Sequence, residues 1–354
     1  MVDQFNIFVR DNIVGYLRVI LVGIGRRLGI FQYLYKKAIS ENKDKKIEYV
    51  SFSVSELITR LNLNERYLNG WLTAAIEVDL FEIENKDTKI LKTCPYIYDF
   101  FIDINNPIYL GTVYGSIYRI ALQEDEVFKN FKTGKLINRN QIPKDIVMEG
   151  HRVTARMGNR LENYFSKHFH QFQKNLKKGG RILEVGCGYG YNLLNWAKKY
   201  KKCSIIGFDI DDEAVNFTRE QVLINKLEER VEVLNTSINE FEIPNDKNKF
   251  DLILLNEVLH EMEMDDNLRK NAIDRLYLLL NEGGIILIGE SIIEDIFDPN
   301  RKPQLLEALH KWQEIGLDSK FYSEKSFREL IALTSFKNVE LIKEMYSSFW
   351  VLKK

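Results

Sequence analysis

The sequence has few cysteines, and the way they are spread excludes several kinds of protein. Only three occur in 354 residues, Cys94, Cys187 and Cys203, and they lie far apart. An odd, scattered set gives neither a disulfide framework nor the paired spacing of a zinc site. We therefore expect no metal in this protein and a reducing, cytoplasmic setting.

Strong net charge, long apolar runs and internal repeats are also missing. The formal net charge is −1 at pH 7, which argues against nucleic acid or a membrane surface as the main partner. No apolar run approaches the roughly 20 residues of a membrane-spanning helix. The first residues include early acids and no small-residue cleavage site, so a signal peptide is not expected. An ordinary composition, 45% hydrophobic, predicts one or two globular domains.

The most informative stretch is 181–190, RILEVGCGYG. A short apolar run containing Glu184 is followed by three glycines spaced two apart, Gly186, Gly188 and Gly190, and then by a helical pattern. Strand, glycine turn and helix form the nucleotide-binding start of a doubly wound α/β sheet. Glycines there permit positive φ and let a ligand approach the backbone closely.

The glycine spacing and Glu184 argue against a dinucleotide as the ligand. The dinucleotide fingerprint is Gly-x-Gly-x-x-Gly, whereas Tyr191 stands where its third glycine belongs. A carboxylate repels a pyrophosphate but suits a cationic ligand such as S-adenosylmethionine (SAM), which carries an ammonium and a sulfonium. The stretch resembles motif I of the class I SAM-dependent methyltransferases, E/D-x-G-x-G-x-G, and matches it at every fixed position.

That resemblance implies SAM as the cofactor and a set of residues that contact it. They are Glu184, Gly186, Cys187, Gly188, Gly190, Asp209, Ile210, Ser237, Ile238 and Asn256.

Three of these positions also have their own reasoning. Asp209 ends the second predicted strand, where an acid accepts hydrogen bonds from ribose hydroxyls, while Asp211 or Asp212 caps the next helix. Ser237 stands where the family usually has an acid for the adenine amino group, and a hydroxyl also accepts but carries no charge. Asn256 lies at the end of the fourth strand, at the edge where ligands collect.

Residues 1–143 predict a mainly helical domain with the order of a winged helix. Ser53 and Glu56 form a capping box before one helix, Asn64 caps the next, and a β-hairpin follows. The second helix, ERYLNGWLTAAIEVDL, has one arginine and several acids, unlike a DNA-reading helix. The region resembles the dimerisation domain of winged-helix small-molecule O-methyltransferases of the hydroxyindole, caffeate and polyketide-tailoring type. The resemblance implies a homodimer and a helical lid over the substrate.

Residues 144–354 predict the catalytic domain. Strands alternate with helices, as in βαβ units, and the chain closes with helix, strand, strand. This matches the Rossmann-like, seven-stranded sheet of the class I methyltransferases, in which the last strand is antiparallel. On the long helix that opens this region, His151 is expected at a surface or an interface, because nothing in the local sequence pairs with it.

The segment LLNEVLHEMEMDDNL resembles the family's W-x-L-H-D-W segment. The resemblance implies that His260 is the general base, that Glu261 is the acid after it, and that Glu290 holds the histidine. Leu-His at this place also occurs in class I methyltransferases without base catalysis, so a structural role for His260 stays open, as does a capping role for Glu290. The family also has a second supporting acid near 317–323, LDSKFYS, and here it is not obvious, because Ser319 and Lys320 occupy the place.

Together these patterns predict a SAM-dependent methyltransferase that acts on a small-molecule acceptor, at a hydroxyl oxygen. The same core would serve a nitrogen, carbon or sulfur acceptor or a peptide side chain. A hypothesis of a different class is a regulator that binds DNA through the winged helix.

Overall fold

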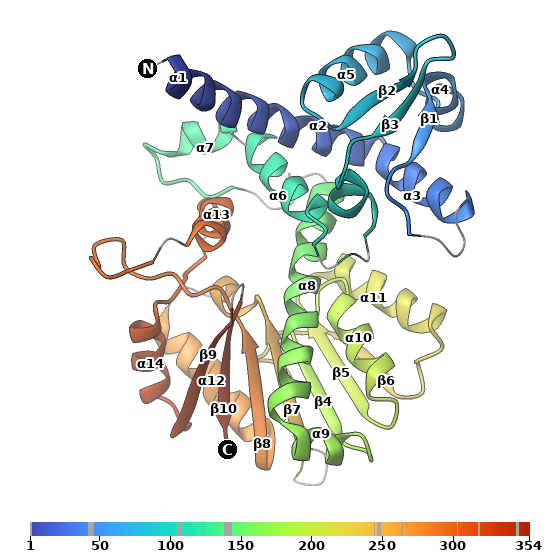
Figure 1. The fold of residues 1–354 in the computed structure, drawn as a ribbon. Coiled ribbons are helices and arrows are strands. Elements are labelled where there is room, and N and C mark those ends of the chain that lie inside the picture. The colour runs from blue at the N-terminus through green and yellow to red at the C-terminus, as the bar shows by residue number, and fades with distance from the viewer. Residues whose placement is uncertain are drawn as a thin grey trace. The chain divides into compact units, whose positions relative to one another are not determined.

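The computed structural model describes residues 2–354 apart from 42–45, 105, 107, 123, 138–143, 244, 246–248, 263–264, 303, 318 and 345–346. The chain divides into two compact units, Met1–Asp125 with Pro143–Gly150 and Glu126–Ile142 with His151–Lys354 (Figure 1). The predicted boundary at 143/144 falls beside residues 138–143, which lie outside the described residues. Among the described helices, none is both long and apolar enough to cross a membrane.

The first unit is mainly helical and contains a small antiparallel sheet of order β1-β3-β2. Its elements are α1 (Val2–Val9), η1 (Arg10–Val14), α2 (Gly15–Arg27), α3 (Ile30–Glu41), β1 (Ser51–Ser53), α4 (Val54–Leu61), α5 (Glu65–Glu77), β2 (Phe81–Asn85), β3 (Ile90–Thr93), η2 (Tyr98–Ile102) and α6 (Gly111–Leu122). Two helices run across the division between the units, α7 (Glu124–Asn130) and α8 (Lys144–His168).

Local side chains fix where α4 and α5 begin. The hydroxyl of Ser53 accepts from the Glu56 N–H at 3.1 Å, and the Glu56 carboxylate accepts from the Ser53 N–H at 3.3 Å. Asn64 accepts from the first N–H groups of α5. These caps satisfy donors that a helix start would otherwise leave unpaired, and they confirm the two predicted helix starts.

The second unit is built on a seven-stranded sheet of order β6-β5-β4-β7-β8-β10-β9. Its strands are β4 (Arg181–Val185), β5 (Ser204–Asp209), β6 (Val231–Asn235), β7 (Phe250–Asn256), β8 (Leu280–Gly289), β9 (Asn338–Glu344) and β10 (Ser347–Lys353). The first five run parallel, and β10 is antiparallel to both of its neighbours. The predicted sheet with an antiparallel last strand is confirmed.

Helices cover both faces of this sheet (Figure 1). They are α9 (His170–Leu176), α10 (Tyr191–Lys199), α11 (Asp212–Ile224), α12 (Asp266–Leu279) and α14 (Glu324–Ala332). The short η5 (Leu259–Glu261) follows β7, and α13 (Leu305–Gln313) lies beyond the carboxyl ends of the strands (Figure 1). Ile182 packs in one apolar cluster and its neighbour Leu183 in the other, because successive strand residues point to opposite faces. With both faces covered, the carboxyl ends of the parallel strands are where a ligand can reach the sheet.

Gly190 provides a test of the turn after β4. Its φ is +70°, and a Cβ there would lie 2.4 Å from Cγ2 of Thr218. Gly283 has a similar φ of +76° with nothing within 4 Å of a Cβ, so it serves as the matched control. We expect Gly283→Ala to lower the free energy of unfolding by about 1–2 kcal/mol through backbone strain, and Gly190→Ala by about 1–3 kcal/mol more through the clash. Urea unfolding followed by circular dichroism measures both, and equal losses would contradict the packing argument.

Candidate active site

The glycine turn after β4 has the backbone geometry that its sequence predicts. Gly186, Gly188 and Gly190 have φ values of 64°, 48° and 70°, a region that side chains disfavour. The Cys187 N–H donates to the Phe208 carbonyl at 3.0 Å. The turn therefore wraps the end of β4 beside the end of β5.

Asp209, at the end of β5, is tied to this turn. Its carboxylate accepts from the Gly188 N–H at 2.7 Å and from the Asp211 N–H at 3.0 Å. Asp211 in turn caps α11, which confirms the predicted helix cap. Burial raises the pKa of Asp209. The next residue, Ile210, is exposed.

Glu184 is the buried acid of the turn. One of its oxygens, Oε1, accepts from the Asn192 amide at 2.8 Å, a partner that the sequence did not suggest. The other, Oε2, has no hydrogen-bond partner among the described residues. Burial raises the pKa of Glu184 to about 8. A buried carboxylate oxygen without a donor is costly, so a cationic ligand beside the glycine turn would supply what the protein itself does not.

The other predicted cofactor positions lie at the ends of the neighbouring strands. Ser237 follows β6, and its hydroxyl donates to Glu240 at 3.0 Å, so an acid does stand at this place, three residues later than the family pattern has it. Ile238 is half-buried and packs against the sheet cluster of Leu183. Asn256 is buried at the end of β7.

His260 lies buried in η5, directly after β7. Its Nδ1 makes a short contact with Oε1 of Glu290, and Oε2 of Glu290 accepts from the Leu259 N–H at 2.9 Å. Phe321 stacks on the imidazole, with ring centroids 4.8 Å apart and planes 12° apart. Glu290 thus holds both the ring and the backbone of the short helix that carries it. Glu261, the next residue, is exposed.

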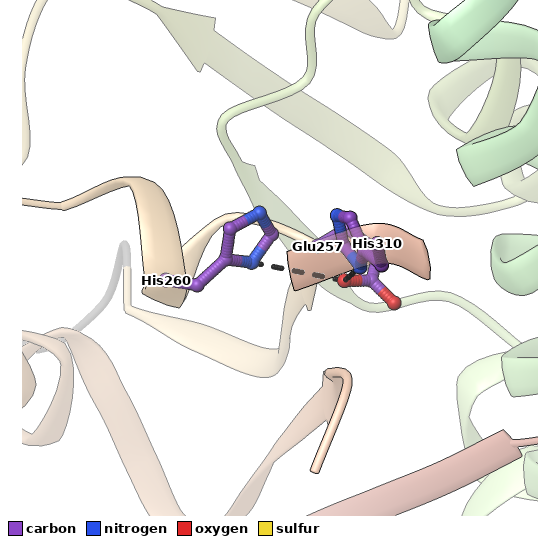
Figure 2. A group of neighbouring side chains, drawn as sticks. All are labelled: Glu257, His260 and His310. Carbon is purple, nitrogen blue, oxygen red and sulfur yellow. Dashed lines mark ion pairs between the residues drawn. The ribbon is translucent and has the colours of Figure 1, made fainter. Parts of the chain in front are cut away.

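Two further residues, Glu257 and His310, join this group, and sequence reasoning missed both (Figure 2). Oε2 of Glu257 lies 3.7 Å from Nδ1 of His260 and also 3.7 Å from Nδ1 of His310. Glu257 has a φ of 55°, which turns its side chain inward right after β7. His310 comes from α13, 50 residues after His260 in the chain, so no local spacing could have indicated the contact.

The charges of the group hold a proton on His260. Burial works against a charged ring, but the carboxylates of Glu290, Glu257 and Glu261 outweigh it and raise the pKa of His260 to about 10. Burial and the charge of Glu290 raise the pKa of Glu257 well above its usual range. Despite burial, the imidazolium lowers the pKa of Glu290. The ligand-free site therefore favours an ion pair of His260 and Glu290 and disfavours a further negative charge on Glu257.

A further buried acid, Glu314, lies just past the end of α13. It accepts from the Ser319 hydroxyl at 3.0 Å, and its carboxylate, that of Glu261 and the His260 ring offer atoms that lie within 4.8 Å of one another. The sequence left the second supporting acid near 317–323 unassigned, and Asp318 of that segment lies outside the described residues. The acid found next to this segment comes from five residues before Ser319 and reaches it through space.

His151, on α8, lies against the glycine turn. Its ring packs on Tyr189 with centroids 4.8 Å apart, and a Cβ on Gly188 would be 3.1 Å from its Nδ1. The side chain is half-buried. The sequence predicted a surface or interface position for His151 and did not predict this contact, because Tyr189 is distant from His151 in the sequence.

Comparison with known proteins identifies the core of the chain. Residues 176–341 match the family model "Methyltransferase domain". They form a methyltransferase domain. The match spans the glycine turn, Asp209, His260 and Glu290, and so covers the predicted site.

Solved structures extend the likeness to the whole fold. Human N-acetylserotonin methyltransferase in complex with SAM has a TM-score of 0.67 at 16% identity, covering 99% of this chain and 98% of that one. The mitomycin 7-O-methyltransferase MmcR has a TM-score of 0.69 at 13% identity, covering 99% and 98%. At such identities the shared property is the fold, which confirms the predicted class I methyltransferase architecture with an N-terminal helical region.

Among curated proteins, N-methyltransferase 4 of Papaver somniferum is 36% identical over 88 residues, which is 25% of this chain. The match spans 24% of the length of that relative.

The unpaired carboxylate of Glu184 predicts how stability depends on pH. Its folded-state pKa, about 8, lies above the ordinary value of 4.5 for a glutamate. Because the folded state binds this proton more tightly, the associated stability is full below about pH 4.5 and is lost as the pH rises through about 8. We expect Glu184→Gln to make the ligand-free protein more resistant to urea than wild type at pH 8.5, and this gain to shrink at pH 5. The exposed Glu232→Gln is the control, and a gain that does not vary with pH would contradict the assignment.

Proposed function

We propose that this protein transfers a methyl group from SAM to a small-molecule acceptor, at a hydroxyl oxygen. The observation that carries the proposal is the unpaired Oε2 of the buried Glu184 beside a glycine turn. That arrangement calls for a cationic ligand, and it lies within a methyltransferase domain. The fold shared with N-acetylserotonin methyltransferase and mitomycin 7-O-methyltransferase supports a small-molecule acceptor rather than a peptide.

The residues of the turn fit this cofactor. Glu184 would accept hydrogen bonds from the ammonium of SAM, and Asp209, already at the surface of the turn, would accept from the ribose hydroxyls. Gly186, Cys187 and Gly188 would let the backbone lie against the amino acid part of the donor. Toward the adenine, Ser237 with Glu240 would offer acceptors. Ile210 and Ile238 would supply apolar contact, and Asn256 would border the donor from the end of β7.

SAM brings a methyl group already activated by the adjacent sulfonium, so positioning supplies much of the rate. His260 acts as general base toward the acceptor hydroxyl, with Glu290 fixing its ring. In the ligand-free site His260 holds its proton, since its pKa is raised to about 10. A bound positive charge opposes a second one nearby, so His260 would give up its proton more readily beside a bound donor and could then accept one from the hydroxyl. Glu261 and Glu314 border the ring.

In this proposal residues 1–143, which have the element order of a winged helix, form an accessory domain for dimerisation and for covering the substrate. Residues 144–354 form the catalytic domain, and the enzyme is cytoplasmic. Its α1–α2 segment exposes large apolar side chains: Ile7, Phe8, Ile13 and Tyr16 are 54–69% exposed. Exposed apolar groups gathered on one segment favour a protein partner. The acids of α5 disfavour DNA binding, as the sequence predicts.

The dimer can be tested by placing charge on this segment. We expect size-exclusion chromatography with light scattering to give twice the chain mass for wild type and one chain mass for the double variant Phe8→Glu, Ile13→Glu, because a charge without a partner is costly at an apolar interface. The double variant Glu82→Gln, Glu84→Gln, on the exposed side of β2, should remain dimeric. A monomeric wild type would exclude the proposed dimer.

The proposed activity predicts separate effects on donor binding and turnover. S-adenosylhomocysteine, the product of SAM, should bind with a Kd on the order of 1 μM. Loss of a charge-assisted hydrogen bond is worth about 1.5–3 kcal/mol, so Glu184→Gln should weaken that binding by about tenfold to a hundredfold. His260→Ala should leave binding unchanged and lower turnover by about 10²–10⁴.

Calorimetry gives the affinities, and release of S-adenosylhomocysteine across a panel of hydroxyl compounds gives the turnover. The exposed His170→Ala is the control for histidine loss. Unchanged turnover in His260→Ala would remove the base role while leaving the methyltransferase assignment intact. Absence of S-adenosylhomocysteine binding to wild type would remove the cofactor assignment itself.

A further inference from the structure

A chain of side chains leads from His260 toward the surface. The His260 side chain is 2% exposed, that of Glu257 is 4% exposed and that of His310 is 22% exposed. Oε2 of Glu257 lies 3.7 Å from each Nδ1 (Figure 2), and the centroids of the two rings are 4.9 Å apart. Each gap exceeds a normal N–O hydrogen bond by about 0.5 Å, so a small rotation of the carboxylate closes either one.

Ser291 provides a second link between Glu257 and His310. Its hydroxyl lies 3.4 Å from Oε1 of Glu257 and 2.8 Å from Nδ1 of His310. A hydroxyl can donate and accept at once, so it can take a proton on one side and release one on the other. The three groups come from the end of β7, the end of β8 and α13, and none of them is needed to hold the His260 ring, which Glu290 already fixes.

A divalent cation is the alternative occupant, because Glu257, His260 and His310 offer ligand atoms within 4.8 Å of one another. Both imidazole nitrogens that would bind it are already engaged, however. Nδ1 of His260 contacts Glu290, and Nδ1 of His310 contacts Ser291. A cation would have to displace both contacts permanently, whereas a proton transfer interrupts the contact of His260 with Glu290 only briefly and uses the contact of His310 with Ser291.

We propose that Glu257, Ser291 and His310 form the proton outlet of His260. This rests on the proposed function, in which His260 takes a proton from the acceptor hydroxyl. A base enclosed as fully as His260 cannot pass that proton directly to water while donor and acceptor fill the site in front of it. His310, partly exposed on α13, is the nearest member of the group that can.

The step balances as follows. The acceptor oxygen forms its bond to the methyl carbon, the C–S bond breaks with its electron pair going to sulfur, and the hydroxyl proton goes to Nε2 of His260, which points away from Glu257 (Figure 2). The imidazolium then gives its Nδ1 proton to the carboxyl group of Glu257. Glu257 passes a proton through Ser291 to His310, which releases it to solvent. The His260 ring is then left with its proton on Nε2. After the product leaves, the ring takes a proton from solvent at Nδ1 and loses the one on Nε2, which restores its starting form. Each methyl transfer releases one proton overall.

Other charged and polar groups surround His260 and His310, and the variants tested below leave them unchanged. They are Glu290 after β8, Glu261 in η5, Arg269 of α12, which donates to the His260 carbonyl at 3.2 Å, Glu314 after α13, and Lys320, whose N–H donates to the same carbonyl at 2.9 Å.

The first experiment needs no activity. The chain has only five histidines, so the full-length protein labelled with ¹⁵N-histidine gives spectra in which each ring can be assigned by single replacement. We expect the rings of His260 and His310 to titrate together in wild type, and Glu257→Gln, which keeps the shape but cannot carry a proton, to shift both titrations and separate them. The exposed Glu232→Gln should change neither. Independent titration of the two rings in wild type would overturn the proposal, as would one equivalent of tightly bound zinc found by elemental analysis and lost in Glu257→Gln.

The second experiment measures turnover. We expect Glu257→Gln and His310→Ala each to lower kcat at least tenfold for a hydroxyl acceptor with KM nearly unchanged, and added imidazole to restore much of the rate in His310→Ala. With an acceptor that is already ionised, such as a nitrophenolate, no proton must leave, and both variants should match wild type. Equal losses with both acceptors, or no rescue by imidazole, would show a structural role instead. If wild type methylates neither acceptor, the proposed function fails, while the coupled titration still tests the link between the two rings.

Discussion

The contact between Glu290 and the segment after β7 is the interaction on which the candidate site depends. One carboxylate holds both the Leu259 N–H and the His260 ring, so it fixes the short helix and the orientation of its histidine together. Glu290 stands at the end of β8, and β8 is hydrogen-bonded to β7 along its length. The sheet therefore fixes the position of the His260 ring. A flexible loop would lose conformational entropy on adopting the same geometry. The sheet instead provides it as a consequence of folding.

Three acids at the ends of parallel strands are buried, and the folded chain compensates each in a different way. Glu290 is balanced by the imidazolium of His260. Glu257 is balanced by a proton, since burial and a neighbouring carboxylate favour its neutral form. Glu184 keeps an unpaired oxygen, and its natural complement is the cation of a ligand. Buried charges persist only when they are paired or neutralised. In the proposed mechanism these three solutions separate the tasks of the site: donor binding at β4, proton handling at β7 and ring positioning at β8.

This arrangement also relates the two charged partners of the reaction. The His260 ring is cationic in the ligand-free site because Glu290, Glu257 and Glu261 stabilise its charge. In the proposed reaction, a positively charged donor would oppose that charge, and methyl transfer would remove the positive charge from sulfur as His260 gains a proton. The total charge near η5 would then change little, which would keep the cost of reorganising the buried groups small.

The sequence by itself determined the sheet, the glycine turn, the capping residues of α4, α5 and α11, and the kind of cofactor. These features depend on residues that are close in the sequence: the alternation of apolar residues, the spacing of the glycines, and the acid beside the glycines. Tertiary structure alone decided that Asn192 supports Glu184, that Glu314 lies near Ser319, and that His310 and Glu257 face each other beside His260. These contacts join residues on different elements, and their side chains carry no local pattern because the fold, through β7, β8 and α13, is what brings them within a few ångströms.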